Sequence, residues 1–176
     1  MDPDSYLCRL ADLFDGVVVT PPSVGAIIAI VLAVALLFAS GFVSASEIAF
    51  FSLAPNDLND IEEENHSSDK YIKSLLKDSE RLLATILISN NFVNVTIIML
   101  CNFFFAQVVD FGGSVIVEFL VITVILTFLL LLFGEIMPKI YSAQHTLKFC
   151  RFAAPVIMVL KKVFSPLSNL LVRSTF

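Results

Sequence analysis

The chain has 176 residues, of which 57% are hydrophobic and 15% are charged, and its formal net charge is −5. A soluble domain ordinarily carries about a quarter charged residues, so this composition favours a membrane protein over a soluble one. The sequence has no basic stripe of the kind that binds nucleic acid, and Cys8, Cys101 and Cys150 are too widely spaced for a zinc site or a disulfide framework.

Three apolar stretches are long enough to cross a bilayer. They cover about residues 24–53, 82–109 and 115–136, and each exceeds the roughly 20 residues that a helix needs to cross the hydrocarbon. Residues 1–22 form an N-terminal arm without the basic start of a removable signal peptide, so we expect the first stretch to be retained as an anchor. We predict an all-α membrane protein with three transmembrane helices within residues 23–138.

Two polar segments lie outside these stretches. Residues 55–81 form helix-favouring sequence that is interrupted near His66, and we predict a water-exposed helical hairpin whose second helix is capped by Asp69. We expect His66 to be solvated there. Residues 139–176 mix basic and apolar positions and predict juxtamembrane amphipathic helices along the inner leaflet, because Lys161, Lys162 and Pro166 disfavour a fourth crossing.

The basic residues predict the orientation in the membrane. The N-terminal arm carries only Arg9, and residues 110–114 carry no Lys or Arg. The remaining basic residues lie in the hairpin and the tail: Lys70, Lys73, Lys77, Arg81, Lys139, Lys148, Arg151, Lys161, Lys162 and Arg173. The positive-inside rule then predicts a multi-pass protein of the cell inner (plasma) membrane, with its N-terminus outside and its C-terminus in the cytoplasm.

The first apolar stretch carries polar residues that lipid disfavours. Ser40, Ser44 and Glu47 are spaced four and three residues apart, so they share one face of a helix. The serines alone could serve close helix packing. Glu47 is different, because an acid within the membrane needs a partner, a proton or a polar cavity.

The second stretch carries three amides on one side. Asn90, Asn91 and Asn94 fall within about 100° of a helical wheel. Each amide offers one carbonyl acceptor and two donors. The cluster can therefore hold neighbouring helices together or present oxygen atoms to a cation.

The third stretch ends in an acid and a proline. Pro138 has no N–H, so the carbonyl of Gly134 loses its partner in an α-helix, beside the carboxylate of Glu135. If the backbone at Gly134 lines a cavity, its carbonyl and the Glu135 carboxylate would be two hard oxygen ligands. The alternative is that the helix simply ends, with Glu135 in contact with water.

Taken together, three helices bring oxygen groups to the same half of the bilayer. No His or Cys is expected in that layer, and oxygen-only sites suit Mg²⁺, Ca²⁺ or Mn²⁺, or Na⁺ where fewer carboxylates are ionised. The sequence therefore predicts a cation site between the helices, with Glu47 as a possible additional ligand.

The motifs SG-x-x-S-x-SE-x-A, NN-x-x-N and GE-x-x-PK occur in this order. Over about residues 23–176 the chain resembles the transmembrane domain of the CorC/CNNM (cyclin M) magnesium transporter family. The resemblance implies three transmembrane helices, a juxtamembrane helical belt, a homodimer in the lipid bilayer, and Mg²⁺ as the transported ion. Carried over by motif, the metal ligands would be Ser40, Ser44, Asn90, Asn91, Asn94, Gly134 and Glu135.

The resemblance also implies parts beyond this sequence. Family members continue into cytosolic CBS domains that bind ATP, and we expect these to be truncated here. The opening MDPDS resembles, more weakly, a gliding-motility-associated branch, and the residues after GEIMPK lack a glycine that many members have.

Two functions remain open at this point. The first is transport of a divalent cation, Mg²⁺ by preference, with Na⁺-coupled export implied by the family. The second is a membrane-embedded dimeric scaffold, or a motility-associated protein, without transport. We predict no enzyme, because the sequence shows no nucleophile–base pair, phosphate-binding glycine loop or metalloprotease spacing.

Overall fold

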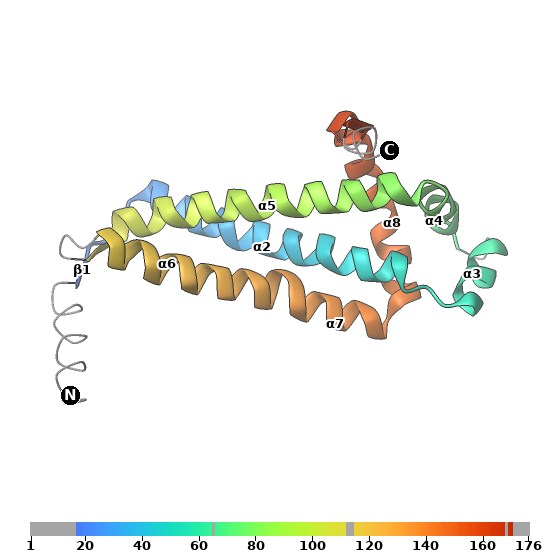
Figure 1. Ribbon diagram of the computed structural model, residues 1–176, viewed down its shortest axis with the longest axis horizontal. Helices are drawn as coiled ribbons and strands as arrows, with labels where there is room; N and C mark the ends of the chain where they lie inside the picture. Colours follow the sequence, from blue (N-terminus) through green and yellow to red (C-terminus); the bar gives the residue numbers. More distant parts are fainter. Residues whose placement is uncertain (1–16, 65, 112–114, 168, 171–176) are drawn as a thin grey trace. The chain divides into compact units, whose positions relative to one another are not determined.

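A computed structural model describes residues 17–64, 66–111, 115–167, 169 and 170. Most of the predicted N-terminal arm, including Cys8 and Arg9, therefore lies outside the described residues. The thin grey trace in Figure 1 marks the residues outside this description. The chain divides into two compact units. Unit 1 comprises residues 1–35 and 96–129, and unit 2 comprises residues 36–95 and 130–176.

Among the described residues, three helices are long and apolar enough to cross a membrane: Val24–Phe51, Ser79–Val108 and Glu118–Gln144. The first two are α2 (Val24–Phe51) and α5 (Ser79–Val108), and the third is composite. This confirms a largely helical, multi-pass membrane protein with three spanning helices. The apolar stretches of the sequence predict these helices because a helix that is hydrophobic all round and at least about 20 residues long is typical of a membrane span.

Unit 1 contains a short two-stranded ribbon that the sequence did not predict. Strand β1 (Val17–Val19) pairs antiparallel with β2 (Val109–Phe111), with Val18 opposite Asp110. The Thr20 N–H donates to the Val108 carbonyl at 2.8 Å, so the ribbon holds the beginning of α2 to the end of α5. The predicted turn at residues 110–114 thus begins in a strand, and residues 112–114 lie outside the described part of the chain.

The third spanning helix changes its winding along its length. It consists of α6 (Val115–Leu129), the π-helix η1 (Leu130–Ile136) and α7 (Met137–Gln144). Pro138, which has no N–H, follows closely after the π-helix, in which hydrogen bonds run to the fifth residue along the chain. The helix therefore passes Pro138 and continues to Gln144, beyond the end near Ile136 that the sequence predicted.

In unit 2, two short helices follow α2. Helix α3 (Pro55–Glu62) starts with a proline in its first turn, and the Ala54 N–H donates to the Asp57 carboxylate at 3.1 Å. Helix α4 (Asp69–Leu76) follows after a connection in which Glu64 has φ 53° and Asn65 lies outside the described residues. These helices occupy the region in which the sequence predicts a hairpin.

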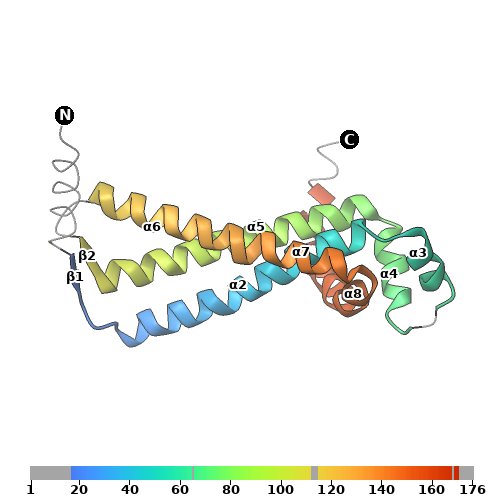
Figure 2. The ribbon, with the colours of Figure 1, turned by 90° about the horizontal axis from the view of Figure 1, so that it is seen from below.

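Helix α8 (Thr146–Val163) runs across the direction of α7 and of the α5 segment in unit 2 (Figure 2). One face of α8 is buried within the unit. Small residues such as Cys150, Ala153 and Ala154 are fully buried, whereas Phe152 and Val159 are exposed. We retain the placement of residues 139–176 along a leaflet as a prediction.

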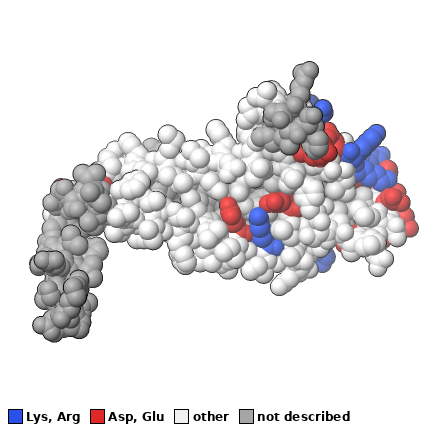
Figure 3. All heavy atoms as spheres, in the orientation of Figure 1, with Lys and Arg blue, Asp and Glu red and all other residues white. Residues whose placement is uncertain are grey.

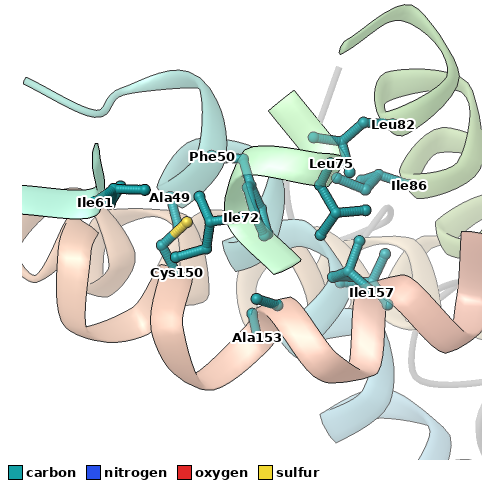
Figure 4. Packing of buried hydrophobic residues seen from close by; sticks show 12 residues of the cluster. Ala49, Phe50, Ile61, Ile72, Leu75, Leu82, Ile86, Cys150, Ala153 and Ile157 are labelled. Atoms are coloured by element: carbon teal, nitrogen blue, oxygen red, sulfur yellow. The ribbon is translucent and has the colours of Figure 1, made fainter. Parts of the chain in front are cut away.

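The packed core of unit 2 joins α8 to the short helices and to the ends of α2 and α5. Figure 4 shows the side chains of α4 and α8 meeting between the other helices. The core cluster contains Val43, Ala49, Phe50, Ile61, Ile72, Leu75, Leu82, Ile86, Cys150, Ala153, Ala154 and Ile157. Since Ile72, Leu75 and Ile157 are fully buried, hydrophobic burial stabilises this end of the bundle without help from lipid.

Candidate cation site

All of the predicted ligands lie in unit 2, and three of them converge. The Ser40 hydroxyl on α2 lies 2.9 Å from Asn90 Oδ1 and 2.6 Å from Asn94 Oδ1, both on α5. A hydroxyl carries a single proton and can donate to only one of these oxygens. The Ser40 hydroxyl and two amide side chains therefore meet between α2 and α5, and each of the three can offer an oxygen atom to a bound cation.

Ser44 lies one turn along α2 from Ser40 and is also fully buried. Its hydroxyl has no hydrogen-bond partner among the described residues. A helical serine can satisfy itself by donating to the carbonyl four residues earlier, as Ser46 does to the Phe42 carbonyl at 2.7 Å. The unpaired hydroxyl of Ser44 is thus available to an oxygen-seeking ligand.

Two glycines bring the third helix against α2. A Cβ placed on Gly134 would lie 3.3 Å from Ser40 Oγ, and one on Gly41 would lie 2.9 Å from Pro138 Cγ. Small residues at a helix contact let two backbones approach closely in a membrane. The π-helix therefore presents its backbone at Gly134 to the hydroxyl that also contacts the two asparagines.

The two acids of the site differ in their surroundings. Glu135 follows Gly134 on η1 and is half-buried. Its side chain forms no hydrogen bond or ion pair with any other described residue. Glu47 on α2 forms an ion pair with Lys139 of α7 at 3.0 Å, and both side chains are about one-third exposed. Glu47, the possible additional ligand, therefore already has a counter-charge, whereas Glu135 does not.

Charged side chains are otherwise sparse along this part of the chain. On the face shown in Figure 3, charged side chains gather at the end that carries α3 and α4 and beside the C-terminal end of α8, and one small mixed cluster lies on an otherwise uncharged surface. Within the described residues, no three His, Cys, Asp or Glu side chains come together as a metal cluster. A cation here would accordingly be held by hydroxyl, amide and carbonyl oxygens with one carboxylate.

Asn91 is placed differently from its neighbours. Its side chain is exposed, and none of the hydrogen bonds described for this unit links it to Ser40 or Ser44. Asn90 and Asn94 are one turn apart and therefore share a face of the helix. Asn91 is rotated about 100° from Asn90 around the helix axis and so lies on a neighbouring face. Of the three predicted amides, the structure brings two, Asn90 and Asn94, to Ser40, and Asn91 as a ligand remains a prediction.

Sequence reasoning missed a buried ion pair outside the candidate site. Asp69 is fully buried and accepts from Arg151 Nε at 2.8 Å and Arg151 Nη2 at 3.1 Å. Burial alone would raise the pKa of Asp69, but the hydrogen bonds from Arg151 and from the His66 N–H, with the charge of Arg151, lower it below its ordinary value. The carboxylate predicted to cap α4 thus joins α4 to α8.

A second polar contact ties α7 to α2 beside the site. The Ser142 hydroxyl, fully buried, donates to the Ala45 carbonyl at 2.7 Å. Nothing in the local spacing of residue 142 signals this contact, because its partner lies 97 positions away in the chain. The contact holds the helix after the π-turn close to the segment of α2 that carries Ser44.

The chain is similar to known proteins over most of its length. It is 31% identical over 137 residues to the "UPF0053 protein" of Haemophilus influenzae, a match that covers 78% of this chain and 31% of that protein. It is 33% identical over 144 residues to the "Metal transporter cnnm-4" of Caenorhabditis elegans, covering 78% of this chain and 29% of that protein. A third relative, the "UPF0053 inner membrane protein YfjD" of Escherichia coli, is 28% identical over 132 residues, covering 75% and 30%.

The chain thus spans about three-tenths of the length of the curated relatives it matches. The family model described as the cyclin M transmembrane N-terminal domain matches residues 31–175, which include every residue of the candidate site. Since that match covers most of the sequence, the chain belongs to the cyclin M transmembrane domain family.

Proposed function

We propose that this chain is the membrane part of a transporter for divalent cations, with Mg²⁺ as the transported ion. The observation that carries the proposal is the pair of buried hydroxyls on α2. Ser44 Oγ has no hydrogen-bond partner among the described residues, and Ser40 Oγ lies within hydrogen-bond distance of the amide side chains of Asn90 and Asn94. Buried polar atoms are nearly always satisfied in a stable protein, so the unpaired Ser44 hydroxyl, one turn from this polar cluster, supports a cation as its partner.

The ligand set fits a hard cation. Ser40, Ser44, Asn90 and Asn94 supply neutral oxygens, and the Gly134 carbonyl lies on the backbone that packs against Ser40. Mg²⁺ prefers oxygen ligands and gives up its water reluctantly, so we expect it to retain some water molecules among these groups. Neutral ligands alone bind weakly, and the uncompensated carboxylate of Glu135 would provide the charge.

The membrane arrangement belongs to the same proposal. We infer a homodimer whose hairpin and C-terminal tail face the cytoplasm in the inner (plasma) membrane, on the strength of the positive-inside rule and the family. Export coupled to Na⁺, and regulation by ATP in CBS domains beyond this sequence, follow from the family resemblance. The nematode relative is named as a metal transporter, and this supports metal transport in general.

The test compares two acids of the third spanning helix. We expect Glu135→Gln to weaken Mg²⁺ binding on the order of a hundredfold, because Gln keeps the size and one oxygen of the side chain but removes its charge from a site of low dielectric. Glu118→Gln, on α6 in unit 1, is the matched control and should bind like the wild type. The measurement is Mg²⁺ titration of the purified full chain by calorimetry.

Equal Mg²⁺ affinity of the wild type and the Glu135→Gln variant would show that the Glu135 carboxylate is not a ligand of the site. Absence of any saturable Mg²⁺ binding to the folded wild type would favour a membrane scaffold whose polar residues only join helices. Uptake of Mg²⁺ into proteoliposomes that contain the full-length protein then separates binding from transport.

A further inference from the structure

A second cavity of unit 2 lies away from the cation site, where the loop before α4 meets α8. It has a volume of about 540 Å³ and is lined by His66, Ser68, Lys148, Arg151, Phe152 and Pro155. The lining residues of α8 are spaced three and four positions apart and form the face opposite the buried Cys150 and Ala153. We refer to this cavity as the basic pocket.

The polar groups of the basic pocket are mainly hydrogen-bond donors. The Ser68 N–H donates to His66 Nδ1 at 3.2 Å, so the neutral imidazole carries its proton on Nε2 and donates from there. Asp69 engages Nε and Nη2 of Arg151, which leaves Nη1 of the guanidinium unused by that pair. Lys148 is exposed and has no ion pair or hydrogen bond with another described residue. Such a lining suits the oxygens of a phosphate.

The charge balance limits what the pocket can hold. Asp69 neutralises Arg151 from behind, and the carboxylates of Asp57 and Asp60 on α3 also act on the guanidinium. Lys148 therefore provides the one uncompensated positive charge of the lining. A singly charged phosphodiester matches this balance better than a doubly charged phosphate monoester.

An apolar groove lies on another side of the same unit, between α2 and the end of the third helix. It has a volume of about 410 Å³ and its lining includes Phe38, Gly41, Phe42, Pro138, Tyr141 and Phe149. Its walls are almost wholly apolar, with Phe38 and Tyr141 strongly exposed. Since α2 and the third helix are spanning helices, a hydrocarbon chain is the occupant that this groove would meet in a membrane.

Three aromatic rings connect the two cavities. The centroid of Phe42 lies 5.7 Å from that of Phe149 and 5.8 Å from that of Phe152, and the rings of Phe149 and Phe152 are 6.4 Å apart. Phe42 and Phe149 line the apolar groove, whereas Phe152 lines the basic pocket. The three rings thus form one aromatic cluster that borders the apolar groove on one side and the basic pocket on the other.

We propose that the basic pocket and the apolar groove together form a binding site for one anionic phospholipid. Its phosphodiester would accept hydrogen bonds from Lys148, Arg151 and His66, and an acyl chain would lie along Phe42 in the groove. Both volumes fall in the range of roughly 300–1,000 Å³ that is usual for small-molecule sites. The site does not depend on the cation site, and lipid bound there would join α2, α7 and α8.

The experiment measures lipid retention by the full chain in detergent with native mass spectrometry. Phosphatidylglycerol, phosphatidylcholine with the same acyl chains, and inorganic phosphate are supplied separately. We expect phosphatidylglycerol to be retained over phosphatidylcholine, whose choline cation would lie beside Lys148. Lys148→Gln should lower phosphatidylglycerol retention about fivefold, the usual effect of one basic residue near an anionic headgroup.

Two matched controls isolate the two cavities. Lys162→Gln removes an exposed charge from the same helix outside the pocket and should leave retention unchanged. Phe38→Ala removes an exposed wall of the groove and should lower retention, whereas Phe128→Ala, at another exposed phenylalanine, on α6, should not. Arg151 is kept intact, because its removal would leave Asp69 buried without a counter-charge.

Three results would overturn the proposal. The first is equal retention of phosphatidylglycerol and phosphatidylcholine, and the second is an equal effect of Lys148→Gln and Lys162→Gln. The third is that inorganic phosphate raises the thermal stability as much as phosphatidylglycerol does, and that Phe38→Ala does not change this effect. That result would identify a site for free phosphate and not for lipid.

Discussion

Ser44 and Ser46 lie two positions apart on α2 and are both fully buried, but they differ in hydrogen bonding. Ser46 donates to the Phe42 carbonyl, whereas Ser44 Oγ has no described partner. We expect Ser44→Ala to weaken Mg²⁺ binding about tenfold, the effect of losing one oxygen ligand worth roughly 1–2 kcal/mol. The metal-free protein should lose no stability, because the substitution removes an unsatisfied buried hydroxyl. Calorimetric titration and thermal unfolding without Mg²⁺ measure the two quantities.

Ser46→Ala serves as the control for this prediction. It removes a hydroxyl that is satisfied within its own helix, so Mg²⁺ affinity should remain that of the wild type. If Ser44→Ala destabilised the metal-free protein and left Mg²⁺ affinity unchanged, Ser44 would be a packing residue and not a ligand.

The glycines at the contact of α2 with the third helix provide a second residue-scale prediction. A Cβ on Gly134 would lie 3.3 Å from Ser40 Oγ, and one on Gly41 would lie 2.9 Å from Pro138 Cγ. We expect Gly134→Ala and Gly41→Ala each to lower the free energy of unfolding by about 1–3 kcal/mol through overpacking. Gly134→Ala should in addition weaken Mg²⁺ binding, because it displaces the Ser40 hydroxyl. Equilibrium unfolding in sodium dodecyl sulfate provides the measurement.

Gly25→Ala is the matched control in the same helix α2. Its nearest neighbour to an added Cβ is Ser23 Oγ at 3.8 Å, an ordinary contact. Alanine is favoured over glycine in a helix by roughly 1 kcal/mol, so this substitution should be neutral or stabilising. Destabilisation of all three variants to the same extent would contradict the close approach at Gly41 and Gly134.

At the scale of elements, the third spanning helix shows what the proline does. The sequence predicts that Pro138 frees the Gly134 carbonyl, and it leaves open that the helix ends there. In the structure, the chain winds as a π-helix over Leu130–Ile136 and then continues as α7. Bonding to the fifth residue along lets a helix accommodate an extra residue, and such turns are frequent at functional sites. The π-turn is also where Gly134 meets Ser40.

The ion pair of Asp69 and Arg151 joins α4 to α8, and its effect can be predicted. Asp69→Asn would leave the Arg151 guanidinium partly buried without a counter-charge, so we expect a loss of about 3 kcal/mol in the free energy of unfolding. The folded pKa of Asp69 lies below its ordinary value of 3.8. The stabilisation is therefore present above pH 3.8 and is lost as the pH falls through the folded pKa. Unfolding of wild type and variant between neutral and acidic pH measures this difference.

Glu64→Gln is the control for this pair. Glu64 contacts Lys70 at 3.9 Å and Lys73 at 3.0 Å, and all three side chains are exposed to solvent. Exposed pairs contribute roughly 0–1 kcal/mol, so the variant should unfold almost as the wild type does. A loss as large as that of Asp69→Asn would mean that burial does not distinguish the two pairs.

At the scale of the whole molecule, the membrane topology is the property that the positive-inside rule predicts most directly. We expect a cysteine introduced at Lys70 in α4 to react with impermeant maleimide only after the membrane is opened, and one at Val19 to react in intact cells. Both positions are exposed, whereas Cys101 and Cys150 are buried, and the labelling is done in a Cys8→Ser background because the arm that carries Cys8 is expected outside. Accessibility of position 70 from outside would reverse the orientation and place the hairpin on the other side.

The sequence alone determined the class of the protein and its three spanning helices. The length of an apolar run reports directly on the thickness of hydrocarbon that it must cross, so 24–53 and 82–109 predict α2 and α5 closely. The sequence also indicated which residue types form the candidate cation site, because Ser, Asn and Glu side chains within a membrane require polar partners. The family match over residues 31–175 agrees with the resemblance drawn from the three motifs.

Only the tertiary structure decided which polar groups meet. Ser40 contacts Asn90 and Asn94, 50 and 54 positions away, while Asn91 is exposed on the neighbouring face. Likewise Glu47 pairs with Lys139, and Asp69 pairs with Arg151 rather than capping α4. Spacing within a helix specifies which residues share a face, but the rotation of one helix against another depends on side-chain packing across the contact, to which distant residues contribute equally.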